Sequence, residues 1–108
     1  MGATSWRMDT STYAAASFTL LRDATAAIDW FRNQGIAPES ILVAAQPPGE
    51  PPRAPRRGDN LRTDLTWVVA LDLQAAALPR SVVRGTFQRE GGKNLSRVPT
   101  FSFLTERT

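Results

Sequence analysis

Residues 18–46 decide the fold, and their sequence is Phe18-Thr-Leu-Leu-Arg-Asp-Ala-Thr-Ala-Ala-Ile-Asp-Trp-Phe-Arg-Asn-Gln-Gly-Ile-Ala-Pro-Glu-Ser-Ile-Leu-Val-Ala-Ala-Gln46. A short apolar run comes first, and Asp23 follows it. Apolar residues then recur at i, i+3, i+4 and i+7, which is the pattern of a helix with one buried face, at Ala24, Ala27, Ile28 and Phe31. Asp23 fits the N-cap of this helix, because its carboxylate can accept from free backbone N–H groups of the first turn.

The end of the helix is marked as clearly as its start. Gly35 fits the left-handed position after the last turn, and Ile36 fits the apolar position of a Schellman motif that packs back on Phe31. A turn at residues 37–40 leads to residues 41–45, a β-branched and apolar run of strand length. The whole stretch therefore predicts strand, helix, strand.

Strand periodicity appears on both sides of this unit. Residues 13–21 alternate and predict the first strand. Residues 65–73 predict a central strand, with one face formed by Leu65, Trp67, Val69, Leu71 and Leu73. Pro79 can open a second helix that ends at Gly91-Gly92. We expect its inward face to hold Val82, Val83, Thr86 and Phe87.

The remaining segments carry weaker signals. Residues 98–104 predict a last strand at a sheet edge, because Pro99 lies near its start. Residues 74–78 fit either the start of the second helix or a separate turn. We expect a flexible arm at 1–12, a single domain at 13–104 and a flexible tail at 105–108.

The order of elements is β-α-β-β-α-β. This order consists of two β-α-β units, which pack together as an α+β fold, the ferredoxin-like split βαβ sandwich. In that fold a four-stranded antiparallel sheet carries both helices on one face.

Residues 15–46 also carry a family resemblance. An apolar strand, a helix opened by Asp23-Ala24, the pair Gly35-Ile36, an acidic-polar turn and the strand at 41–45 follow one another. This order resembles the amino-terminal unit of the heat-induced or general stress protein family. After residue 46 the glycine- and alanine-rich segment of that family is replaced by a loop rich in proline and arginine. The resemblance implies a cytoplasmic bacterial protein related to stress, without a defined activity.

Composition excludes several kinds of chemistry. Histidine and cysteine are both absent, which excludes Ser-His and Cys-His triads, common zinc sites and disulfides. Asp59, Asp64 and Asp72 are isolated carboxylates whose spacing does not match a calcium loop. We therefore predict no catalytic residue, no metal and no cofactor, and the protein is not expected to be an enzyme. No apolar run reaches the roughly 18 residues of a membrane span, so we expect a soluble, cytoplasmic protein.

Residues 47–63 stand apart in composition, with five prolines and four arginines. We interpret them as a solvated linker that is mobile on the nanosecond timescale and lies outside the core. The alternative is an anion or nucleic-acid site, to which the predicted second helix would add two arginines. Its candidate residues are Arg53, Arg56, Arg57, Arg62, Arg80 and Arg84.

The sheet face away from the predicted helices has small and apolar residues where polar ones are normal. They are Ala15, Ser17, Leu42, Ala44, Val68 and Ala70. We predict that this face forms a sheet-to-sheet homodimer, the alternative being a monomer whose arm or tail folds over it. The favoured function is a small non-catalytic interaction domain that acts by self-association or protein binding. The alternatives are a nucleic-acid-binding module and a small-ligand regulatory domain or enzyme.

Overall fold

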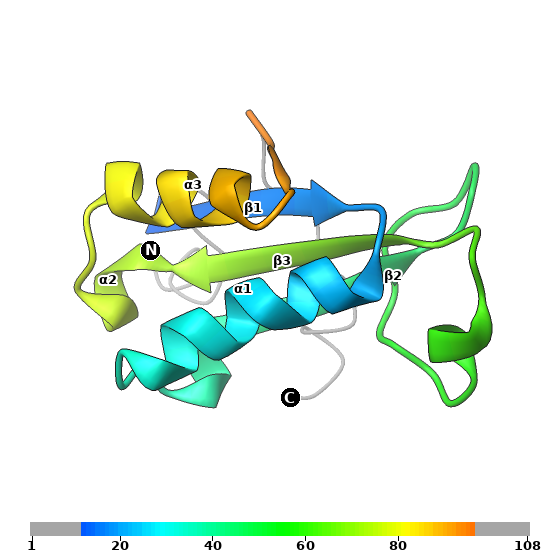
Figure 1. Ribbon diagram of the computed structural model, residues 1–108, viewed down its shortest axis with the longest axis horizontal. Coiled ribbons are helices and arrows are strands. Elements are labelled where there is room, and N and C mark those ends of the chain that lie inside the picture. Colours follow the sequence, from blue (N-terminus) through cyan, green and yellow to red (C-terminus); the bar gives the residue numbers. More distant parts are fainter. Residues whose placement is uncertain (1–11, 97–108) are drawn as a thin grey trace, which may run out of the picture.

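The computed structural model describes residues 12–96, which form an α+β structure with helices packed on one face of a four-stranded antiparallel sheet (Figure 1). The strands and helices follow in the order β1 (Tyr13–Phe18), α1 (Leu21–Asn33), β2 (Ile41–Gln46), β3 (Thr66–Asp72), α2 (Leu73–Ala76), α3 (Arg80–Arg89) and β4 (Lys93–Asn94). Two short 3₁₀ turns, η3 (Pro38–Ser40) and η4 (Asp59–Leu61), lie before β2 and before β3.

The strand order across the sheet is β2-β3-β1-β4, and every neighbouring pair is antiparallel. Strand β3 therefore lies between β1 and β2, and β1 lies between β3 and β4. Both central strands are paired along their length, from Tyr13↔Asp72 to Phe18↔Trp67. The prediction of an α+β protein with a four-stranded antiparallel sheet is confirmed.

Helix α1 starts three residues before the predicted position. Leu20 is its N-cap residue and makes no side-chain cap hydrogen bond, while its carbonyl accepts from the N–H groups of Asp23 and Ala24, both at 3.2 Å. The prediction of Asp23 as N-cap is wrong because the apolar run divides between β1, which ends at Phe18, and the first turn of the helix. Asp23 lies in that first turn, where a negative charge is still favourable to the helix dipole.

The end of α1 is as predicted. Gly35 has a φ of 88°, and its N–H donates to Arg32 O at 3.0 Å. The N–H of Ile36 donates to Phe31 O at 3.2 Å, which completes the Schellman pattern. Ile36 is buried against the core.

The segment after β3 resolves the alternatives left open at 74–78. Asp72 accepts hydrogen bonds from the N–H groups of Gln74 (3.1 Å) and Ala75 (3.2 Å), so its carboxylate caps the separate short helix α2. In α3 the buried face consists of Val83, Thr86 and Phe87. Val82 is 42% exposed, so its predicted inward position is wrong: it lies one residue off the i, i+3, i+4 stripe.

The last strand comes earlier than the sequence predicts. Lys93 and Asn94 pair with Ser17 and Ala16 directly after Gly91-Gly92. The predicted strand at 98–104 and the predicted tail lie outside the described residues, as does the predicted arm apart from Thr12. A Cβ on Gly92 would lie 2.6 Å from Cζ of Phe18, so the absence of a side chain lets the chain pass directly over that ring.

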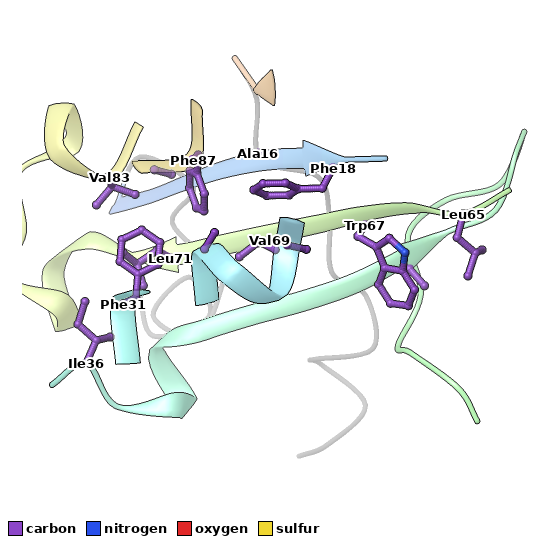
Figure 2. Packing of buried hydrophobic residues seen from close by; sticks show 14 residues of the cluster. Ala16, Phe18, Phe31, Ile36, Leu65, Trp67, Val69, Leu71, Val83 and Phe87 are labelled. Atoms are coloured by element: carbon purple, nitrogen blue, oxygen red, sulfur yellow. The ribbon is translucent and has the colours of Figure 1, made fainter. Parts of the chain in front are cut away.

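The main core lies between the sheet and the helices (Figure 2). Phe87 contacts Phe18 and Phe31 edge-to-face, with ring centroids 6.0 and 5.5 Å apart. Trp67, Val69 and Leu71 line the sheet side, as their alternation predicts. A second, smaller apolar cluster occupies the opposite face of the sheet, and its buried members are Ala15, Ala44, Val68 and Ala70.

Candidate functional site

The loop of residues 47–63 joins β2 to β3 and extends beyond the end of the sheet, at the right of Figure 1. It contributes no residue to either apolar cluster, but it is attached to the sheet by hydrogen bonds. The N–H of Ala45 donates to Arg53 O and the N–H of Arg53 donates to Ala45 O, both at 2.9 Å. Because β2 is an edge strand, this bridge places Arg53 along its outer edge.

The Asp59 carboxylate holds the loop together from within. Oδ2 accepts from Nη1 of Arg53 at 2.9 Å and from the backbone N–H of Arg56 at 2.7 Å, and Oδ1 accepts from Nη2 of Arg53 at 3.0 Å. Asp59 is only 4% exposed, and the Arg53 side chain is 17% exposed. A bidentate arginine-carboxylate pair fixes both partners in direction as well as distance. We call residues 47–63, fixed in this way, the Asp59 loop.

The same contacts set the charge state of Asp59. The hydrogen bonds from the Arg53 guanidinium, and next the one from the Arg56 N–H, lower the pKa of Asp59 from its ordinary 3.8 to about 2. All of these bonds favour the ionised carboxylate, which accepts at both oxygens. Asp59 therefore stays charged, and keeps its partners, at any pH near neutrality.

Local sequence explains why the chain turns here. Gly58 has a φ of 92°, a left-handed conformation that side-chain-bearing residues rarely adopt, and it is the residue before η4. The N–H of Asp59 donates to Arg56 O at 3.1 Å, which closes the turn. The turn aims the Asp59 side chain back at Arg53, six residues earlier.

The predicted basic residues of the loop divide into two kinds. Arg53 is paired with Asp59, and Arg62 is paired with Asp64 through bonds of 2.8 and 2.7 Å at the surface. Arg56 and Arg57 are exposed. Within residues 12–96 their side chains make no hydrogen bond or ion pair, so they are the loop arginines open to a partner.

The two helix arginines lie elsewhere. Nη1 of Arg80 donates to Tyr13 O at 2.9 Å, at the end of the sheet where Tyr13 pairs with Asp72. The loop leaves from the other end of β3, where Thr66 pairs with Gln46. Six residues at roughly 3.3 Å each put the two ends about 20 Å apart. The structure therefore does not bring the six predicted arginines into one patch.

The predicted dimer face is gathered on the side of the sheet away from α1 and α3. Ala15, Ala44, Val68 and Ala70 are each at most 2% exposed, and they pack with the half-buried Tyr13, Leu42 and Leu95. Ser17 and Leu42 are half-buried. These four residues are already buried within one chain, so their burial is no evidence that a second copy covers them. A homodimer through this face stays a prediction. The alternative of a folded-over arm or tail concerns residues outside the described range.

The acidic residues that the structure describes do not form a metal site. Among residues 12–96 no three acidic side chains gather closely enough to hold a metal ion. Asp59 and Asp64 pair with arginines, and Asp72 caps α2. In the same residues no helix has the length and apolar character needed to cross a membrane.

The sequence reasoning missed the role of Asp59. Its one available signal was the position of a carboxylate directly after a glycine, among arginines that would otherwise repel one another. No family model, curated protein or solved structure matches this chain. We therefore infer function from the geometry of the loop.

Proposed function

We propose that this protein is a small non-catalytic interaction domain that binds another protein through the Asp59 loop. The observation that carries the proposal is the buried Asp59 carboxylate, which accepts three hydrogen bonds within a loop that is otherwise rich in proline. Loops longer than about 12–15 residues without secondary structure of their own are mostly functional or disordered. A solvated linker has no need of a buried ion pair, whereas a binding loop gains from being ordered before its partner arrives.

The proposed scaffold is ferredoxin-like. The sheet order β2-β3-β1-β4 supports it. The strands of the β1-α1-β2 unit then have β3 between them, and the strands of the β3-α3-β4 unit have β1 between them. On such a scaffold the β2-β3 connection is free to extend from the end of the sheet, since neither α1 nor α3 packs over it in Figure 1. Loops held on a rigid sheet commonly carry binding residues.

Charge favours a protein partner over nucleic acid. From residue 50 to residue 64 the chain has four arginines and three acidic residues, Glu50, Asp59 and Asp64, a net charge of +1. Nucleic-acid binding depends on many phosphate contacts, and each needs an available positive charge. Only Arg56 and Arg57 of this loop are exposed without an ion-pair partner among the described residues. A cytoplasmic, stress-related role and a homodimer remain predictions beside this proposal.

The test is affinity capture from an extract of the cells that make the protein. The wild-type chain and an Arg84→Ala control should retain the same protein partner, because Arg84 lies on α3 away from the loop. A double variant, Arg56→Ala with Arg57→Ala, should lose it. Capture of the same proteins by all three chains would contradict the proposal, and capture that nuclease treatment abolishes would favour the nucleic-acid alternative.

A further inference from the structure

We propose that residues 51–57 are a preformed polyproline II ligand for an aromatic-lined groove on the partner protein. Their sequence is Pro51-Pro52-Arg53-Ala54-Pro55-Arg56-Arg57. It contains two X-Pro pairs, Pro51-Pro52 and Ala54-Pro55, whose prolines are three residues apart. Arg57 lies two residues after the second pair. This inference rests on the proposed function and names the class of partner.

The backbone of this segment has little choice of conformation. Each proline fixes φ near −65°, and each residue before a proline is confined to extended or polyproline II geometry, which applies to Pro51 and Ala54. Arg53 is held extended by its bridge to Ala45. Neither helix nor strand forms at 51–52 or 54–56. These restrictions favour the extended backbone that a polyproline II ligand needs before any partner binds.

The contacts of the segment sort its residues into ridges. A polyproline II helix has three residues per turn, so residues 53 and 56 share one ridge. Both members of that ridge are bound by Asp59, Arg53 through its guanidinium and Arg56 through its backbone N–H. The protein itself therefore occupies one ridge of the three.

The other two ridges are available to a partner. One holds Pro51 and Ala54, which are both exposed, and the other holds Pro52, which is half-buried, and Pro55, which is exposed. A groove contacts two ridges of such a helix and leaves the third outside. The ridge that it would leave outside is the one that Asp59 already binds.

The partner can be described by its chemistry. Proline-rich segments of this spacing dock in shallow grooves lined by aromatic side chains, which take one X-Pro pair in each pocket. Arg57 is exposed, and its side chain has no hydrogen-bond or ion-pair partner among residues 12–96. A carboxylate at the end of the groove would accept from it, as arginine prefers. The partner class is therefore a protein domain with an aromatic, proline-binding groove and an acidic rim.

The test is a titration of the ¹⁵N-labelled full chain with an isolated SH3 domain that binds Pro-x-x-Pro-x-Arg ligands. We expect amide shifts confined to the Asp59 loop. Pro55→Ala and Arg57→Ala should each weaken binding by about tenfold or more, as expected when one anchor of a small interface is lost. Arg84→Ala is the matched control and should bind like the wild type. Asp59→Asn should weaken binding less than Pro55→Ala, because it removes the ordering of the ligand and none of its contact atoms.

Two results would overturn the inference. One is the absence of loop shifts when the SH3 domain is added to the wild type. The other is binding to the SH3 domain that Arg57→Ala weakens and Pro55→Ala leaves unchanged. The loop would then act through its positive charge alone, and a polyglutamate peptide should bind equally well. Affinity capture with Pro55→Ala separates this failure from that of the proposed function. A partner that Pro55→Ala retains and the Arg56, Arg57 double variant loses would leave the proposed function standing without the groove.

Discussion

The main core and the Asp59 loop are ordered by opposite means. The core is held by many apolar contacts, among them the edge-to-face rings of Phe18, Phe31 and Phe87. The loop is held by one carboxylate with three hydrogen bonds and by one backbone bridge. Because the core has many weak contacts, it can lose any one of them and still keep its fold. The order of the loop, in contrast, depends on one residue, Asp59.

The largest effect should come from removing an aromatic ring from the core. Phe31 is fully buried and packs edge-to-face on both Trp30 and Phe87. Phe31→Ala should lower the free energy of unfolding by about 3–5 kcal/mol, through lost burial and the cavity left behind. Chemical denaturation measures it. Leu61→Ala is the control, because Leu61 is 81% exposed and should change stability by less than about 0.5 kcal/mol. Equal losses would show that the core is not where the stability lies.

A smaller effect should come from adding one methyl group to the core. Gly92→Ala would put a Cβ 2.6 Å from Phe18 Cζ and 3.0 Å from Phe87 O, and overpacking of this kind costs about 1–3 kcal/mol. The matched control is Gly85→Ala in α3, where the added carbon would have no atom within 4 Å apart from the neighbouring backbone of its own helix. That change should stabilise the protein by about 0.5–1 kcal/mol through helix propensity. If Gly92→Ala stabilised the protein as Gly85→Ala is expected to, the close approach of Gly92 to Phe18 would be refuted.

The sequence predicted the parts of this fold in which apolar residues recur with a short period or a local cap signal is present. Alternation located β1 and β3 and sorted their residues correctly between the two faces. The glycine signal at Gly35 located the end of α1 because a left-handed cap is a local requirement. The start of α1 was missed, since an apolar run that ends a strand and begins a helix contains no mark of the division.

The parts that depend on distant contacts could not be predicted. Strand β4 is two residues long, and its position follows from how Gly92 packs on Phe18, 74 positions away in the chain. Pairing of Arg53 with Asp59 needs the left-handed turn at Gly58, and nothing periodic marks it. The sequence-based prediction of a basic site combined the loop arginines with Arg80, because composition does not show where a residue lies. The loop and Arg80 lie at opposite ends of the sheet.

Acid should affect the loop before it affects the core. The pKa of Asp59 is lowered in the folded protein to about 2, from 3.8. A lowered pKa means that the carboxylate stabilises the folded loop above pH 4, and that this stabilisation is lost as the pH falls from about 4 through about 2. The amide shift of Arg56, whose N–H donates to Asp59, should titrate with a midpoint near pH 2. A midpoint near 4, or the same titration in Asp59→Asn, would mean that the carboxylate does not hold the loop.

Backbone ¹⁵N relaxation tests the central claim most directly, namely that Asp59 orders a binding loop. In the wild type we expect residues 53–59 to be as rigid on the picosecond-to-nanosecond timescale as β3, against the mobility that composition alone predicts. Asp59→Asn should make them mobile and leave β3 unchanged. Asp64→Asn, which removes only the exposed partner of Arg62, should leave residues 53–59 rigid. A wild-type loop that is mobile while β3 is rigid, or a loop as rigid in Asp59→Asn as in the wild type, would contradict the claim.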